Sequence, residues 1–295
     1  MPTPRVLALQ LDASDPPARL GEWLAAAGLE LDVVALDAGQ ALPELSGYAG
    51  LLVMGGAMGA MEDVRAPYLP AVRALLREAV GAEVPTLGVC LGHQLLAAAN
   101  GGRVQRIPAG PEIGAQLVAK RGVAGTDPLF AALPITPDVV QWHFDEVVTL
   151  PPGAIQLFSS PTCDQQAFRL GRLAWGIQFH IETTPDMVRA WARNHEADLD
   201  DRDLDRIVER TVAVHDDLLE VWQPFAAAFA EIVRDPDSVP AARGVPTSTA
   251  APITDPAAIR AALAAELEQS RSAPLPPPGP QTLPMPQRRP PTDDG

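Results

Sequence analysis

A cysteine lies at the point where an apolar run gives way to a helical pattern. Cys90 follows the apolar run 85–89, precedes a helical pattern over 94–99, and has Gly88 and Gly92 on either side. A strand that turns this sharply into a helix holds the residue at the turn in a strained conformation, which only small neighbours allow. The helix N-terminus that follows favours a thiolate over a thiol through its amide groups and dipole. The pattern therefore predicts a nucleophilic cysteine at position 90.

A histidine and a glutamate two positions apart supply the other groups that a thiolate nucleophile needs. His180 and Glu182 lie in the apolar segment 176–182. In an extended segment their side chains point to the same side, with Cα atoms ~6.5–7 Å apart. The glutamate can then accept a hydrogen bond from one imidazole nitrogen and leave the other for Cys90, as in Cys-His-carboxylate triads. Alone, such a pair is more typical of a protein surface, but beside a cysteine turn it predicts a proton shuttle.

A glycine pair ends another apolar run. Gly55 and Gly56 follow the run 50–54, and no Lys-Ser/Thr pair comes after them, which excludes a phosphate-binding P-loop. Such a pair either meets the need of a turn for positive φ or directs a backbone amide toward the nucleophile. Open α/β sheets place their sites at the carboxyl ends of strands, which favours the second interpretation. We therefore predict an oxyanion hole formed by the amides of Gly56 and Leu91.

The elements that must position these residues alternate over the first hundred positions. Short apolar runs, each bounded by turn residues, predict strands over 6–9, 31–36, 50–54 and 85–89. Helical patterns lie between them, over 19–27 and 69–79. This alternation is typical of βαβ units around a buried parallel sheet, so the predicted class is α/β.

After Asn100 the pattern changes. Closely spaced strand patterns predict hairpins added to the parallel core, over 104–107, 115–120, 141–150, 155–159, 166–170 and 173–181. From Pro185 to Ile232 the pattern is helical again, and acidic residues at Asp186 and Asp203 suit helix N-termini. We expect a catalytic domain over 1–184 and a helical extension packed on it over 185–232.

The C-terminal segment 233–295 has a different composition. It holds 14 of the 32 prolines and no aromatic residue, so it cannot bury much apolar surface. We expect a mostly disordered, Pro-rich tail, with a short helix near 256–269 that begins at Asp255-Pro256. A docking helix or a ligand for a proline-recognition domain is the alternative interpretation.

Composition excludes several classes of function. The 37 acidic residues outnumber the 22 basic ones, giving a net charge of −15 without clustered cations, so we expect no nucleic-acid partner. No apolar stretch approaches the ~20 residues that cross a bilayer, so no membrane association is expected. The two cysteines, Cys90 and Cys163, form no disulfide framework, and no leader pattern opens the sequence; both features favour a cytoplasmic protein. The five histidines show no metal-ligand spacing, so neither a metal nor a cofactor is expected.

Three segments in a fixed order carry a resemblance to a known family. Residues 55–56, 88–94 and 178–182 resemble the motifs of the class I (triad) glutamine amidotransferases, in particular those that are similar to the amidotransferase domain of GMP synthase. The resemblance runs from about Val6 to Glu182. It implies an open, mostly parallel central sheet with flanking helices, which is the flavodoxin-like fold of that family.

The resemblance also implies an activity and residue roles. Cys90 would attack the side-chain amide of L-glutamine and form a γ-glutamyl thioester, while His180 protonates the leaving ammonia and then activates water. Glu182 would orient the histidine. The remaining site residues implied are the oxyanion-hole residues Gly56 and Leu91 and the substrate-binding residues Gly55, Gln94 and His143.

Two positions depart from the family pattern, and one motif is absent. Ile181 and Ala57 stand where the family usually has proline. The first departure affects only the local turn geometry, and the second leaves the backbone amide of Gly56 less rigidly held. The sequence contains no Ser-Gly-Gly-x-Asp-Ser pyrophosphatase motif, so a separate synthase subunit is the expected acceptor of ammonia. Two alternatives remain open: the same triad could hydrolyse another γ-glutamyl amide, or the protein could be a catalytically silent regulatory or binding subunit.

Other polar residues have less specific interpretations. His143, in Trp142-His143-Phe144-Asp145, is expected either to support the site or to have a structural role at a strand end. We expect His93 to cap or pack at the start of its helix, and His195 and His215 to be solvated. Charged residues after the glycine pair are expected either to be solvated or to line the substrate pocket: Glu62, Asp63 and Arg65.

Overall fold

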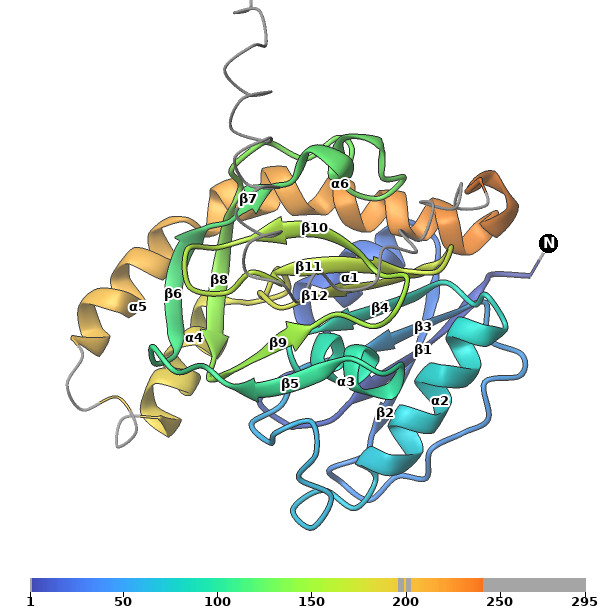
Figure 1. The fold of residues 1–295 in the computed structure, drawn as a ribbon, viewed down its shortest axis with the longest axis horizontal. Coiled ribbons are helices and arrows are strands. Elements are labelled where there is room, and N and C mark those ends of the chain that lie inside the picture. Colours follow the sequence, from blue (N-terminus) through green and yellow to red (C-terminus); the bar gives the residue numbers. More distant parts are fainter. Residues whose placement is uncertain (1, 196–198, 200–202, 241–295) are drawn as a thin grey trace, which may run out of the picture. The chain divides into compact units, whose positions relative to one another are not determined.

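The fold is built on one eight-stranded sheet with helices on both faces (Figure 1). The computed structural model describes residues 2–195, 199 and 203–240. The strand order is β2-β1-β3-β4-β12-β11-β10-β7. The strands that form the parallel half are β1 (Arg5–Gln10), β2 (Glu30–Ala35), β3 (Gly50–Val53), β4 (Thr86–Val89) and β12 (Ala174–Ile177).

The parallel half confirms the predicted α/β class. Its order, β2-β1-β3-β4-β12, is the doubly wound order of flavodoxin-like folds. Residue pairs such as Val53 with Gly88, and Gly88 with Gly176, fix the register across the centre. Because these strands are parallel, their carboxyl ends meet at one edge of the sheet.

The antiparallel half consists of β12, β11 (Ala167–Leu170), β10 (Ile155–Ser159) and β7 (Ala119–Lys120). Two small sheets lie outside it, each formed by two antiparallel strands. They pair β5 (Arg103–Arg106) with β9 (Asp145–Thr149), and β6 (Glu112–Leu117) with β8 (Asp138–His143).

Three strands predicted as continuous are interrupted. The run 115–120 divides at Val118 between β6 and β7, which belong to different sheets. The run 141–150 divides at Phe144, because the chain changes its pairing partner from β6 to β5 there. The run 173–181 ends as a strand at Ile177, and His180 instead forms an isolated bridge with Val140. In each of these three segments the sequence stays apolar across the point where the chain changes the strand with which it pairs.

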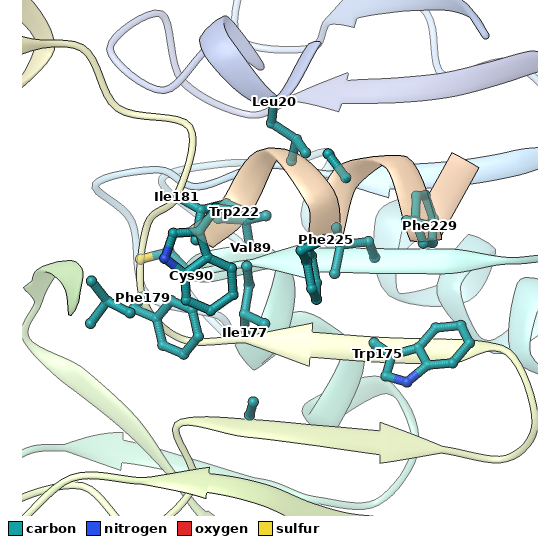
Figure 2. Close-up of a cluster of buried hydrophobic side chains, with 14 of the residues drawn as sticks. Leu20, Val89, Cys90, Trp175, Ile177, Phe179, Ile181, Trp222, Phe225 and Phe229 are labelled. Carbon is teal, nitrogen blue, oxygen red and sulfur yellow. The ribbon is translucent and has the colours of Figure 1, made fainter. Parts of the chain in front are cut away.

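Each face of the parallel sheet has its own apolar core. Alternating β1 residues divide between them: Val6 and Ala8 join the core with α1 (Ala18–Ala26) and α6 (His215–Arg234), whereas Leu7 and Leu9 join the core with α2 (Leu69–Gly81) and α3 (Leu91–Ala99). Figure 2 shows Trp222, Phe225 and Phe229 of α6 among the buried side chains of the first core.

The helices after Pro185 begin as predicted. The N-terminus of α4 (Pro185–Asn194) is capped by Thr184, whose side chain accepts from the Met187 amide, and Asp186 lies in the first turn. Asp203 caps α5 (Leu204–Ala213) in the same way. Single-turn 3₁₀ helices span Gly122–Thr126 and Pro236–Ser238.

The C-terminal segment is described only in part. The helix α6 extends to Arg234, and Val239 is buried. The predicted short helix near 256–269, with the rest of the Pro-rich tail from 241 onward, lies outside the described residues. In the parts of the chain that are described, no helix has both the length and the apolar character that crossing a membrane requires.

The turn from β4 into α3 is strained. Cys90 has φ 52° and ψ −104°, a conformation that side-chain-bearing residues rarely adopt. The turn is also closely packed, since a Cβ atom at Gly88 would lie 2.5 Å from the carbonyl oxygen of Gly92. A Cβ atom at Gly92 would clash in turn with the carbonyl oxygen of Val53. Glycine at both positions is therefore a steric requirement.

Replacing Gly88 by alanine is expected to destabilise the fold. The new methyl group would clash with the backbone carbonyl group of Gly92, which cannot move aside as a flexible side chain could. Gly88→Ala should therefore lower the free energy of unfolding by about 3 kcal/mol. Urea denaturation followed by circular dichroism measures the change. Gly81→Ala is the matched control, because a Cβ atom there meets nothing within 4 Å, and it should leave stability unchanged or raise it by up to about 1 kcal/mol. Equal effects of the two variants would contradict the steric explanation.

Candidate active site

Four loops at the carboxyl edge of the parallel sheet surround one cavity. They follow β1, β3, β4 and β12, and they contribute Asp15, Gly56, Cys90 and His180 to its lining. The cavity has a volume of about 140 Å³. Since one water needs roughly 10–15 Å³ by this measure, the cavity holds about ten water-sized groups, enough for a small amino acid.

The residues predicted for the site divide between the cavity wall and the layer behind it. Those in the wall are Gly56, Cys90, Gln94, His143 and His180. The others, Gly55, Leu91 and Glu182, are buried directly behind it. The charged residues Glu62 and Arg65 also line the cavity, whereas Asp63 pairs with Arg73.

His180 and Glu182 form a buried pair. His180 Nδ1 lies 2.6 Å from Glu182 Oε1, and the second carboxylate oxygen accepts from the Ile181 amide at 2.9 Å. The glutamate is fully buried and the histidine is 1% exposed. Burial by itself would lower the pKa of His180, but the negative charge of Glu182, the charge of Cys90 and hydrogen bonds to both hold it well above its usual value.

Two glutamines form a chain of hydrogen bonds that ends at Cys90. Gln178 Nε2 donates to Cys90 Sγ at 3.7 Å, and Gln94 Nε2 donates to Gln178 Oε1 at 3.1 Å. The same Gln94 nitrogen also donates to the carbonyl oxygen of Asp145, at 3.1 Å. Both amide hydrogens of Gln94 are therefore used within the protein, which leaves its oxygen as the group that can bind a ligand.

A buried carboxylate anchors this chain of hydrogen bonds. Glu112 accepts from His143 Nε2 at 2.9 Å, and His143 Nδ1 lies 2.9 Å from the carbonyl oxygen of Asp145. Burial alone would raise the pKa of Glu112, but hydrogen bonds from His143, Ser160 and Thr162 lower it. Because both ring nitrogens of His143 bind within the protein, its geometry favours a supporting role over direct contact with a ligand.

Aromatic rings form the wall next to the histidine. The Trp191 ring lies 4.6 Å from that of His180, between centroids, and its Nε1 donates to the Ser14 carbonyl oxygen. His195, expected to be solvated, instead lines the cavity and accepts from Trp142 Nε1. The same expectation was wrong for His215, which is buried because its ring fits between Thr183 and Thr211.

His93 packs within the protein, as predicted. Its ring is fully buried against Phe168, with centroids 4.8 Å apart, and burial lowers its pKa to about 3. In the part of the chain that the structure describes, His, Cys, Asp and Glu residues form no group of three that could hold a metal ion.

The sequence interpretation missed three residues of the site. Asp15 lines the cavity, Gln178 contacts the cysteine sulfur, and Glu112 anchors His143. A signal existed for Asp15, because polar residues that follow the first strand belong to the same sheet edge as Cys90. Glu112 carries no such signal, since it lies at the start of an edge strand.

Comparison with known proteins matches this arrangement to one family. The model of the family glutamine amidotransferase class-I matches residues 19–191. A crystal structure of a glutamine amidotransferase from Thermotoga maritima superposes with a TM-score of 0.70 and 28% identity, covering 80% of this chain and 100% of that one.

Two curated relatives match shorter segments. A glutamine-hydrolysing GMP synthase subunit from Thermococcus kodakarensis is 42% identical over 100 residues, which cover 34% of this chain and 51% of that protein. Gamma-glutamyl peptidase 4 from Arabidopsis thaliana is 27% identical over 147 residues, which cover 49% of this chain and 58% of the relative. The chain thus spans between about half and three fifths of the length of these relatives.

Removing the charge of Glu182 is expected to lower the pKa of His180. Glu182→Gln keeps the size of the side chain but removes its negative charge. In the wild type the pKa of His180 is higher in the folded protein than its unfolded value of about 6.5. The His180–Glu182 pair therefore stabilises the fold fully at pH values below about 6.5, and this stabilisation is lost as pH rises through the pKa of His180 in the folded protein. Titration of ¹³C-labelled histidine by NMR measures the shift. The exposed Glu22→Gln control should leave the His180 resonance unchanged, and an unaltered pKa in Glu182→Gln would refute the charge interaction.

Proposed function

The chain belongs to the class I glutamine amidotransferase family, and on this premise we propose that it hydrolyses the side-chain amide of L-glutamine through a cysteine thioester. Cys90, His180 and Glu182 are the proposed catalytic triad. The observation that carries the proposal is the meeting of a strained, helix-capping cysteine with a buried His180–Glu182 pair at one cavity. A cysteine, a base and a group that orients the base are the parts of a nucleophilic acyl-transfer site.

Acylation begins with attack of the Cys90 thiolate on the carbonyl carbon of the amide. The negative charge moves to the carbonyl oxygen, where the proposed donors are the backbone amides of Gly56 and Leu91. The C–N bond then breaks, and its electron pair stays on nitrogen. His180, held protonated by Glu182, gives its proton to that nitrogen, so that ammonia leaves and a γ-glutamyl thioester remains.

Deacylation uses the same groups in the reverse sense. The neutral His180 takes a proton from water, whose oxygen attacks the thioester carbonyl, and the C–S bond breaks to give glutamate and the Cys90 thiolate. Glu182 stabilises the imidazolium in both steps, because its carboxylate stays on Nδ1. Gln178 supports the thiolate as a positioning residue through its hydrogen bond to Sγ.

The substrate is proposed to lie between Gly56 and Gln94. The free oxygen of Gln94 suits a donor on the substrate, and Arg106, which lines the cavity and stacks on Phe144, offers a positive charge to a carboxylate. His143 would form part of the pocket wall, and Gly55 would shape the pocket from behind. The proposed catalytic unit is the segment 1–184, with 185–232 as its helical extension.

The ammonia is proposed to pass to a separate acceptor enzyme. The support is that one relative is named as a subunit of a glutamine-hydrolysing GMP synthase.

A second candidate is hydrolysis of another γ-glutamyl amide. The similarity to a gamma-glutamyl peptidase favours it. The triad chemistry is the same, and only the amine that leaves differs. The alternative of a catalytically silent protein is less favoured, because Cys90 and His180 line one cavity and His180 contacts Glu182.

The decisive variant removes the nucleophile. Cys90→Ala should reduce ammonia release from L-glutamine by at least about 10³-fold, since no thioester can form. A glutamate dehydrogenase assay measures ammonia, and mass spectrometry of acid-quenched enzyme detects the thioester on Cys90. Cys163→Ala is the control: that thiol is buried outside the cavity, and burial raises its pKa to about 12, so activity should be retained.

The outcomes separate the candidates. Thioester formation with L-glutamine supports the amidotransferase proposal even where turnover is slow in the absence of a partner. Turnover of γ-glutamyl amines, without reaction of glutamine itself, would support the second candidate. If neither L-glutamine nor γ-glutamyl amines form a thioester, both candidate functions are refuted.

A further inference from the structure

A buried carboxylate in the cavity has no task in the mechanism described above. Asp15 lies in the loop after β1, lines the cavity with Cys90 and His180, and is 6% exposed. We propose that its carboxylate binds the leaving group by accepting a hydrogen bond from the scissile nitrogen, so that the site selects γ-glutamyl amides over γ-glutamyl esters. This inference rests on the proposed acyl-transfer function.

The loop that carries Asp15 is held in place by its own hydrogen bonds. Ser14 Oγ lies 2.8 Å from Asp12 Oδ1 and 2.6 Å from Asp15 Oδ2, so its single proton bridges the two carboxylates, while the Asp15 amide donates to the Asp12 carbonyl oxygen at 3.0 Å. The Ser14 carbonyl oxygen accepts from Trp191 Nε1 at 3.0 Å, which ties the loop to α4. The carboxylate is therefore fixed before any ligand binds.

One oxygen of this carboxylate is free. Oδ2 accepts from Ser14, whereas Oδ1 accepts no hydrogen bond from the described residues. Because Asp15 lines the cavity, Oδ1 is available to a hydrogen-bond donor of a molecule bound there.

The position of Oδ1 identifies which part of the ligand it meets. A Cβ atom added to Gly55 would lie 2.5 Å from Asp15 Oδ1 and 3.3 Å from His180 Cε1, so both atoms border the same point. His180 gives its proton to the leaving nitrogen, and that nitrogen must therefore lie beside the histidine. Asp15 borders His180, whereas Gln178 contacts Cys90 and is linked through Gln94 to the carbonyl oxygen of Asp145.

The charges around Asp15 suit a donor ligand. Burial raises its pKa to about 6; His180 and the Ser14 hydrogen bond oppose this rise, and Glu182 and Asp12 add to it. At neutral pH the group is mainly ionised and can only accept hydrogen bonds. A primary amide nitrogen has two N–H groups, whereas an ester oxygen has none and would face the carboxylate with its lone pairs.

The role in acylation follows from this contact. When the C–N bond breaks, the electron pair stays on nitrogen and the proton comes from His180. The two original N–H groups remain on the nitrogen, and one of them stays on Asp15 Oδ1. This contact holds the lone pair toward the histidine, so Asp15 would touch the reacting group as a catalytic residue.

The test compares two substrates that form the same thioester. For L-glutamine, Asp15→Ala should lower kcat/KM by about 10- to 100-fold, as for loss of a hydrogen bond to a charged group. For L-glutamate γ-methyl ester the value should stay within about threefold of the wild type or rise. The ratio kcat/KM reports acylation, because the leaving group departs before the shared thioester is hydrolysed. Asp15→Asn, which keeps an acceptor oxygen but no charge, should give an intermediate value with glutamine.

A neighbouring carboxylate provides the control. Glu62 also lines the cavity but is exposed and pairs with Arg65, so Glu62→Gln should affect both substrates to the same extent. Equal losses with the two substrates in Asp15→Ala, or an unchanged rate with glutamine, would overturn the inference. A wild-type enzyme that reacts with the ester but not with glutamine would also overturn it. Reaction with neither substrate would refute the proposed function, and this inference with it.

Discussion

The turn at Cys90 exists only because glycine stands on both sides of it. Positive φ at the cysteine brings the start of α3 against the strands, where any Cβ atom at Gly88 or Gly92 would meet backbone. The rest of the site depends on this approach. It puts the sulfur at the helix N-terminus, directs Gln94 one turn later toward Gln178, and buries His93 against Gly176. The strain is local, and β4 is held by the burial of Leu87 and Val89 in one apolar core and by the close packing of Gly88 against Gly92 on its other face.

Three buried carboxylates surround the cavity, and their partners decide what each can do. Glu182 is committed to His180, and Glu112 is committed to His143 and three further donors. Both are satisfied within the protein, so they hold other residues in place. Asp15 differs because one oxygen is left without a partner among the described residues. In a low-dielectric site, a satisfied carboxylate positions its neighbours, and an incompletely satisfied one is available to a ligand.

Local patterns predicted the parallel half of the fold well, and the antiparallel half less well. The helix predicted over 69–79 corresponds to α2, and the strand predicted over 85–89 begins one residue before β4. Both were predictable because consecutive elements of a βαβ unit are also adjacent in space. The strands β5, β6, β8 and β9 pair across larger separations, and two of their boundaries fall where the partner changes. Apolar periodicity indicates that a segment is buried but not which strand it pairs with. The sequence around Phe144 and Val118 therefore did not indicate that the predicted strands end there.

Local chemistry could be predicted from the amino-acid sequence alone: a cysteine between glycines at a strand-helix turn, and a histidine two residues from a glutamate. These relations depend on backbone geometry over a few residues, and the His180–Glu182 contact persists although β12 ends at Ile177. The distant side chains that join them became known from the folded arrangement. Asp15 and Glu112 reach the site because parallel strands end at one edge and because small sheets fold over it, and no spacing along the chain encodes either fact.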